Sequence, residues 1–134
     1  MNIQERIERF LASEAFGVAG ASSRRHKYGN KVLRCYLQNG RRAIPINPVE
    51  TEIEGEKVVA NLADLPDEVQ SLSLITPPQI TEKLVEQAVA RGIRNIWMQP
   101  GAESAKAIAY CEEQGLNLIA DGSCVLVVLG YREI

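Results

Sequence analysis

Histidine and cysteine are scarce in this chain of 134 residues, which has one histidine and three cysteines. The single histidine, His26, excludes metal sites built from several histidines and would have to serve any Ser–His or Cys–His pair. The cysteines, Cys35, Cys111 and Cys124, form no CxxC pair and no even disulfide framework. We therefore expect a protein of a reducing, cytoplasmic compartment.

The sequence also lacks a long apolar run and an excess of either charge. No apolar stretch approaches the ~20 residues that a bilayer span needs, and no signal peptide is visible. Fifteen basic and 17 acidic residues give a formal net charge of −2, so no bulk field draws the chain to nucleic acid or to an anionic membrane. With 46% apolar and 24% charged residues, the composition is that of a globular protein. We expect one domain over residues 1–134.

Short apolar segments alternate with amphipathic ones along the chain. The apolar segments predict strands at residues 16–20, 42–46, 71–75, 94–98 and 116–120. The amphipathic segments predict helices at residues 2–13, 28–39, 81–91 and 102–114. A minor strand is expected near residues 57–59, and the apolar run 124–129 fits either a helix or a strand.

Sequence signals also predict details within the helices. Asn2 and Glu5 have the spacing of a capping box at the first helix. We expect Thr81 to cap the third helix and Gly92 to end it. The periodicity of the fourth helix predicts that its inward side consists of Ala105, Ile108 and Ala109.

The alternation of strands and helices is typical of βαβ units, which form a parallel sheet with helices on both faces. Because such crossovers are right-handed, we predict a three-layer α/β fold, a Rossmann-like doubly wound sheet of about five mainly parallel strands. Ligands of these folds bind beyond the carboxyl ends of the strands, where the strand order reverses. Candidate site residues should therefore directly follow residues 20, 46, 75, 98 and 120.

The loop after the first predicted strand has the clearest chemistry. It reads Gly20-Ala21-Ser22-Ser23-Arg24-Arg25-His26-Lys27-Tyr28-Gly29. Its small residues allow the backbone to approach a bulky anion, its serines can donate hydrogen bonds, and the next helix presents free N–H groups. We interpret the segment as an anion site, with a solvated loop whose glycines only form turns as the alternative.

The fingerprint for NAD is incomplete in this loop. That motif has glycines at its first, third and sixth positions, and counted from Gly20 the third and sixth positions are Ser22 and Arg25. NAD sites also favour an acidic residue at the end of the second strand, where this chain has Asn47-Pro48, with Glu50 a little beyond. No GK[ST] sequence is present, so a Walker phosphate loop is absent as well.

Three other strand ends contain rigid or polar residues. Thr76-Pro77-Pro78 forms a stiff lip that suits the wall of a nucleotide or pantetheine groove, or only starts a helix. Gln99 could contact a polar ligand group and Gly101 permits close approach, unless both only form a turn. Asp121 and Cys124 follow the fifth strand, and a cysteine before an apolar run is more often buried and inert.

The order and spacing of several segments resemble a known family. The segments are VAGASSRRHKYGNKV (18–32), IPINP (44–48), I-x-G-x-x-V (53–58), LADLP (62–66), TPP (76–78) and W-x-Q-x-G (97–101). Together they are similar to the small bacterial and archaeal CoA-binding proteins, stand-alone relatives of the CoA-binding domain of the succinyl-CoA synthetase α subunit. The resemblance covers about residues 10–124 and implies a Rossmann-like fold that binds coenzyme A or an acyl-CoA.

The resemblance also implies where the ligand lies. Its phosphates would contact Gly20, Ala21, Ser22, Ser23, Tyr28 and Gly29. Its adenosine would border Asn47 and Pro48. Its pantetheine would pass Thr76, Pro77 and Pro78 toward Gln99 and Gly101. We further hypothesise that one basic side chain among Arg24, Arg25 and Lys27 pairs with the 3′-phosphate.

Catalytic signatures are missing from this sequence. It has no GxSxG, no HExxH and no cysteine cluster, and it lacks the phosphohistidine domain of the synthetases. It also departs from the family after the fifth strand, where an Asp-Arg-Cys-Pro-like element is replaced by residues 121–125 and the apolar tail 124–134. The residues therefore favour a binding module, with an NAD(P)-binding oxidoreductase-like module or a protein-interaction module as alternatives. The protein partners to consider are a second copy of the chain and an acyl-CoA enzyme.

Overall fold

A five-stranded parallel sheet forms the centre of the computed structural model, which describes all 134 residues. The strands are β1 (Ala15–Ala19), β2 (Arg42–Ile46), β5 (Val69–Leu74), β6 (Asn95–Met98) and β7 (Asn117–Ile119). Their order across the sheet is β2-β1-β5-β6-β7. The chain passes from β1 to β2 and then returns beyond β1 to β5, so the strand order reverses between β1 and β5.

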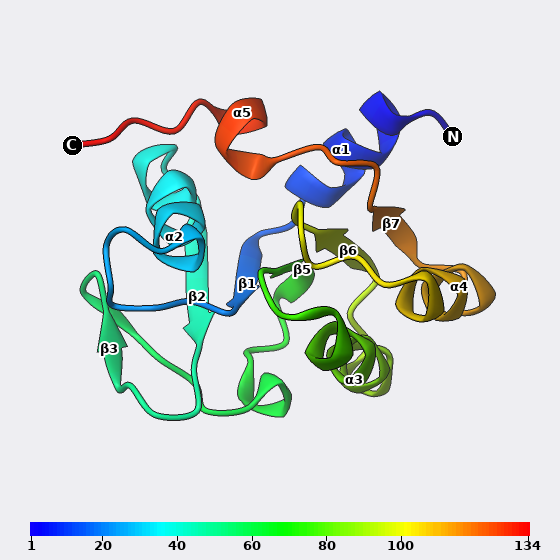
Figure 1. Cartoon of the computed structure of the whole chain (residues 1–134), viewed down its shortest axis with the longest axis horizontal. Helices are drawn as coiled ribbons and strands as arrows, with labels where there is room; N and C mark the ends of the chain where they lie inside the picture. Colours follow the sequence, from blue (N-terminus) through cyan, green and yellow to red (C-terminus); the bar gives the residue numbers. More distant parts are fainter.

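Helices cover both faces of this sheet (Figure 1). One face is covered by α1 (Ile3–Leu11), α2 (Tyr28–Gln38) and α5 (Val125–Leu129). The other is covered by α3 (Pro78–Arg91), α4 (Ala105–Glu113) and the 3₁₀ turn η1 (Leu62–Asp64). The predicted three-layer, Rossmann-like fold is thereby confirmed. None of the helices is both long and apolar enough to span a membrane.

Two apolar cores lie between the sheet and its two helical layers. Strand β5 shows how the sequence separates them, because Leu72 and Leu74 pack toward α3 and α4 while Ser71 and Ser73 point to the opposite face. Each buried serine has a partner: the Ser71 hydroxyl donates to the Phe10 carbonyl at 2.7 Å, and the Ser73 and Tyr36 hydroxyls are 2.6 Å apart. These hydrogen bonds offset the cost of burying the hydroxyls.

Most predicted elements agree with the structure to within one or two residues. The capping box at α1 and the left-handed Gly92 that ends α3 are both present. The undecided run at 124–129 contains helix α5. The expected minor strand near 57–59 is part of an antiparallel hairpin, β3 (Glu52–Ile53) with β4 (Glu56–Lys57), and Val59 forms an isolated parallel bridge to Ile46.

Two predictions about helices were wrong. Helix α3 begins at Pro78 rather than at 81, because proline at the first helical position has its φ already set and has no N–H to leave unpaired. Thr81 therefore lies inside the first turn, where its hydroxyl is 2.7 Å from that of Thr76. Helix α4 begins at Ala105, after the Ser104 side chain has capped it. Its buried side consists of Ala107 and Cys111, with Ile108 partly buried against the core as predicted, while Ala105 and Ala109 are exposed.

The ends of β1 and β5 and the start of α2 are in direct backbone contact. A Cβ atom on Gly20 would lie 1.9 Å from the carbonyl oxygen of Ile75, and one on Gly29 would lie 1.9 Å from the carbonyl oxygen of Gly20. Gly20 also has φ +92°, a conformation that residues with a side chain rarely adopt. Glycine at both positions is therefore required for the packing of these three segments.

We expect Gly20→Ala to destabilise the fold more than Gly92→Ala. Both glycines have similar left-handed backbones, φ +92° and +86°, but nothing lies within 4 Å of a Cβ at Gly92. The left-handed conformation should cost about 1–2 kcal/mol in each variant, and overpacking should add about 1–3 kcal/mol at Gly20 alone. Urea unfolding measures the difference in free energy of unfolding, and equal losses would contradict the crowding seen at Gly20.

Candidate functional site

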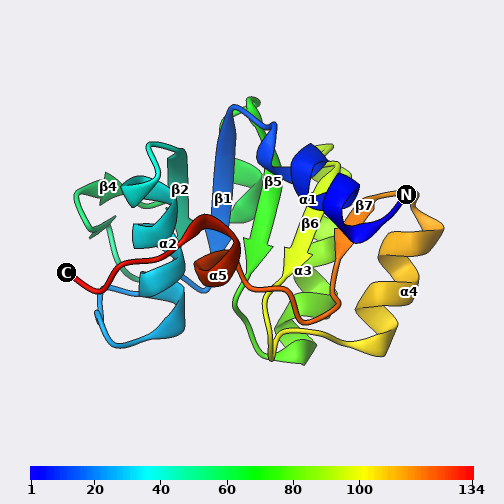
Figure 2. The ribbon, with the colours of Figure 1, turned by 90° about the horizontal axis from the view of Figure 1, so that it is seen from above.

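The carboxyl ends of all five strands lie along one edge of the sheet (Figure 2). A hollow of ≈ 250 Å³ opens at the reversal point and is lined by Gly20, Pro48 and Thr76 together with residues of α3. A second hollow of ≈ 240 Å³ is lined by Thr76, Pro77 and Gly101. Because Thr76 lines both, the two hollows adjoin along the edge. The structure thus brings together five predicted site residues that come from four strand ends.

Two carbonyl oxygens of the loop at residues 20–28 accept hydrogen bonds from side chains of α2. Asn30 donates from Nδ2 to the Ser22 carbonyl at 2.8 Å, and Arg34 donates from Nη2 to the Arg25 carbonyl at 2.7 Å. These two residues also bind each other, since Arg34 Nε donates to Asn30 Oδ1 at 2.6 Å. Both side chains are buried. These hydrogen bonds therefore hold the backbone of the loop in the shape seen here.

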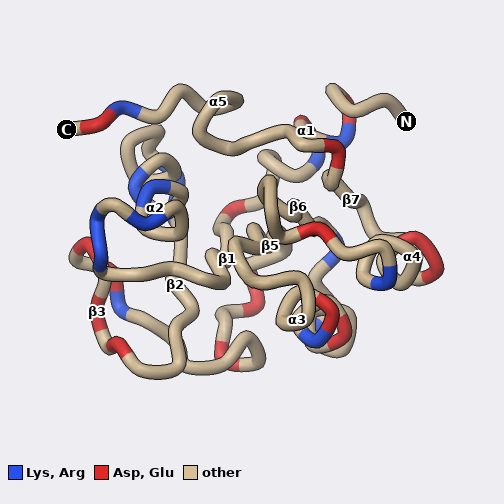
Figure 3. Tube along the Cα trace, in the orientation of Figure 1, with Lys and Arg blue, Asp and Glu red and all other residues tan.

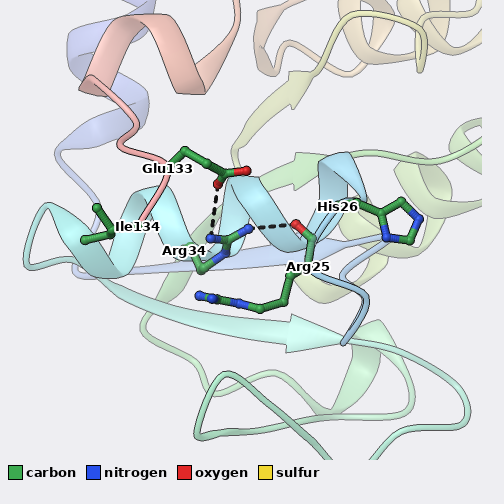
Figure 4. Close-up of a pocket in the computed structure, with 5 residues that line it drawn as sticks. All are labelled: Arg25, His26, Arg34, Glu133 and Ile134. Atoms are coloured by element: carbon green, nitrogen blue, oxygen red, sulfur yellow. Dashed lines mark hydrogen bonds and ion pairs between the residues drawn. The ribbon is translucent and has the colours of Figure 1, made fainter.

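A buried arginine needs compensating charge and acceptors, and the C-terminal residues supply part of them (Figure 4). Arg34 Nη1 lies 3.3 Å from Glu133 Oε2, and its guanidinium lies over the Tyr131 ring at 5.5 Å from the centroid. Lys31 Nζ is 3.5 Å from the other oxygen of Glu133. The tail therefore stabilises the cation that supports the loop.

One amide of the loop already holds an anion. The backbone N–H of Ser23 donates to Glu50 Oε2 at 3.0 Å, and hydrogen bonding by Ser23 lowers the pKa of the Glu50 carboxyl. Asn47 positions this glutamate by accepting its backbone N–H at 2.9 Å and by donating to the Ala21 carbonyl at 3.0 Å. Glu50, which the sequence offered as a substitute ribose-binding acid, thus binds the loop itself in this structure.

The first turn of α2 has amides without acceptors. Its N-cap residue, Lys27, makes no side-chain cap, and no group in the chain accepts from the N–H groups of Tyr28 and Gly29. Unpaired N–H groups at the positive end of a helix favour a bound anion. Gly29 is buried beneath Gly20, so its side of the helix is closed by packing.

Cations gather around the same loop, on α2 and the segment before it (Figure 3). Arg24 and Lys27 are exposed and form no ion pair. Arg25 differs, because its Nε lies 3.2 Å from Glu54 Oε2. Arg24 and Lys27 are therefore the two loop cations that remain available to a phosphate.

A second polar cluster joins the start of α2 to the residues that follow β6 and β7. The Tyr28 hydroxyl donates to Gln99 Oε1 at 3.1 Å and lies 2.8 Å from Cys124 Sγ, and the Val125 N–H donates to the same Gln99 oxygen at 2.9 Å. Trp97 Nε1 fixes the neighbouring Ser123 carbonyl at 2.9 Å. Burial and the contact with Cys124 raise the pKa of Tyr28, so its phenol stays protonated. Gln99 is fully buried and Cys124 partly exposed.

Several other predicted residues do not line either of the two hollows. Pro78 starts α3, is exposed and lines neither hollow. Ala21 is buried, and the Ser22 hydroxyl accepts the Arg24 N–H at 3.1 Å within the loop. The site predicted from the sequence did not include Asn30, Arg34, Glu54 or Glu133. The one-turn spacing of Asn30 and Arg34 on an otherwise apolar side of the helix was the available signal.

The geometry defines a protein of the Rossmann-like α/β class, with the loop at residues 20–28 next to its strand-order reversal. A family model described as a CoA binding domain matches residues 14–130 of the chain. The chain belongs to this family, and membership supports coenzyme A binding in general. The resemblance seen in the sequence is thereby confirmed.

Proteins of bacteria and archaea are similar to this chain. YneT of Bacillus subtilis is 24% identical over 119 residues, which cover 89% of this chain and 86% of YneT. A conserved hypothetical protein from Pyrococcus furiosus is 33% identical with a TM-score of 0.82, and the match covers 86% of this chain and 98% of that one. The dinucleotide-forming acetyl-coenzyme A synthetase 1 of Ca. Korarchaeum cryptofilum shares the fold, with a TM-score of 0.71 and 22% identity over 81% of this chain and 26% of the synthetase.

We expect the Ser23 amide to report the ionisation of Glu50. Because the pKa of Glu50 is lowered in the fold, its hydrogen bond to Ser23 should persist above the ordinary glutamate value of about 4.3 and be lost as the pH falls through the lower folded value. The amide proton shift of Ser23, followed by NMR, should titrate with a midpoint below that ordinary value.

Glu50→Gln should abolish this titration, whereas Glu86→Gln, on the exposed side of α3, should leave it unchanged. A Ser23 titration that persists in Glu50→Gln would show that another carboxylate holds the loop.

Proposed function

We propose that this protein binds coenzyme A or an acyl-CoA along the carboxyl edge of its sheet. The diphosphate would lie on the loop at residues 20–28 and the first turn of α2. The observation that carries this proposal is the orientation of that loop, with its carbonyl oxygens tied to Asn30 and Arg34 and its Ser23 amide on a carboxylate. A backbone arranged in this way favours an anion over a cation or a neutral group.

The two adjoining hollows give the rest of the ligand a path. The adenosine would occupy the hollow between Pro48 and Thr76, and the pantetheine would follow the second hollow past Pro77 and Gly101. Two small hollows in series suit an elongated ligand better than one deep cavity would. The synthetase that shares this fold has acetyl-coenzyme A in its name, which supports the same class of ligand.

The proposed activity is binding, without a named reaction. No group of three or more His, Cys, Asp or Glu side chains is arranged to hold a metal ion. His26 is exposed on the loop and points away from Arg34 and Glu133 (Figure 4). Asn47, which would border the adenosine, has its side chain committed to Ala21 and Glu50, so we assign it the role of shaping the site.

Coenzyme A and acetyl-CoA should raise the melting temperature, and NAD and NADP should not. At about 100 times the dissociation constant, a ligand that binds only the folded state adds ~2.7 kcal/mol to the free energy of unfolding. Differential scanning fluorimetry with CoA, acetyl-CoA, dephospho-CoA, NAD and NADP tests this expectation. A shift with NAD(P) alone would favour the oxidoreductase-like alternative, and no shift with any of them would favour a protein-interaction module.

Arg24 and Lys27 should recognise the 3′-phosphate. The double variant Arg24→Glu/Lys27→Glu should weaken CoA at least about tenfold, or ~1.4 kcal/mol, because charge-assisted contacts to phosphate would be replaced by repulsion. Dephospho-CoA, which lacks that phosphate, should lose much less affinity. Isothermal titration calorimetry measures both, with Lys106→Glu on exposed α4 as the matched control. Equal losses for the two ligands would rule out this role.

A further inference from the structure

The hollow at the strand-order reversal has apolar walls from two parts of the chain. Ile46, at the end of β2, and Pro48 just beyond it line the hollow. Ile80 and Leu84 line it from α3. Because Ile80 is 42% exposed, part of this apolar surface is open to a ligand. Such walls favour a ligand group with apolar faces.

Two side-chain amides, those of Asn61 and Gln87, line the same hollow. They also line a third hollow of ≈ 520 Å³, whose other residues belong to η1 and α3. The two amides therefore lie where these hollows adjoin. Gly20, the first residue of the loop at residues 20–28, lines the hollow at the reversal as well. That hollow thus extends from the loop to the pair of amides.

Neither amide has a strong hydrogen bond within the fold. Asn61 is the N-cap residue of η1, and an asparagine at the start of a helix commonly accepts a backbone N–H, but its side chain makes no such bond. Its only side-chain contact, from Nδ2 to Asp64 Oδ2, is 3.5 Å long, beyond the ordinary range for N–H···O bonds. The Gln87 side chain is exposed on α3 and makes no hydrogen bond with the chain. Each amide is therefore free to donate to a ligand and to accept from it.

The hollow at the reversal is lined by no charged side chain. A phosphate or a carboxylate that entered it would lose hydration without gaining a countercharge. A neutral group with hydrogen-bonding atoms meets no such penalty, because the amides replace its contacts with water. The exposed cations Arg24 and Lys27 lie instead on the loop. The charged and the neutral parts of a nucleotide thus have different places along this edge.

The chemistry that meets these groups is a flat base with apolar faces, a polar edge and a link to a phosphate. We propose that Asn61 and Gln87 recognise the adenine base, with an amide oxygen accepting from the 6-amino group and an amide nitrogen donating to the adjacent ring nitrogen. Adenine presents a donor and an acceptor side by side, and a side-chain amide matches this pair. The inference rests on the proposed function, because that function places the adenosine in this hollow.

Isothermal titration calorimetry with CoA and 1,N6-etheno-CoA tests this role. The etheno bridge leaves no N–H on the former amino nitrogen, so the wild-type chain should bind this analogue about tenfold more weakly than CoA. Asn61→Leu/Gln87→Met keeps nearly the native side-chain volumes and removes both amides. It should weaken CoA about tenfold and reduce the preference over the analogue to about twofold or less. Gln79→Met, also exposed on α3 but outside every hollow, should behave as wild type.

The outcomes separate this inference from the proposed function. Wild-type CoA affinity in the double variant would overturn the adenine assignment and leave the proposed function standing. Equal losses for CoA and the etheno analogue would also overturn the assignment, because the amides would then only shape the hollow. Absence of CoA binding by the wild-type chain would overturn both. Should the double variant fail to fold by circular dichroism, Gln87→Met alone is titrated with the same two ligands, with an expected loss for CoA of about threefold.

Discussion

Hydrogen bonds to the carbonyl oxygens of the loop at residues 20–28 determine which backbone groups the carboxyl edge of the sheet presents to a ligand. A polypeptide loop presents backbone donors and acceptors in nearly equal number, and it favours an anion when its N–H groups point outward and its carbonyl oxygens point away. Asn30 and Arg34 occupy two of them from the body of α2. The same bonds require a buried guanidinium, and this explains why the C-terminal Glu133 and Tyr131 pack against α2.

The close backbone contacts also determine where the loop lies. Gly20 and Gly29 allow the end of β1, the end of β5 and the start of α2 to meet without side chains between them. This contact sets the loop directly above the strand-order reversal, where a doubly wound sheet opens to a ligand. The glycine that the sequence suggested for ligand approach is thus first a packing residue, since its missing Cβ makes room for the Ile75 carbonyl.

The fold was predictable because several local sequence signals mark the helices and strands. Alternating apolar segments, Gly92 after α3 and the capping box of Asn2 with Glu5 all depend on neighbours in the sequence. The start of α3 was missed because two signals compete there, and a proline at the first helical position outweighed Thr81 as a cap. In α4 the predicted inward side was displaced, because Ala107 and Cys111, four residues apart, are buried with Ile108 packed beside them, while Ala105 and Ala109 are exposed.

The polar interior of the site was harder to predict, because its partners come from distant parts of the chain. Arg34 depends on residues near the C-terminus, and Gln99 on Tyr28 and Val125. No periodicity links such positions. A strand end predicts that a polar residue lies at the edge of the sheet, but its neighbours decide which of its atoms remain unpaired. At Gln99 the Val125 N–H at the start of α5 binds the oxygen, and the nitrogen is left without a hydrogen-bond partner.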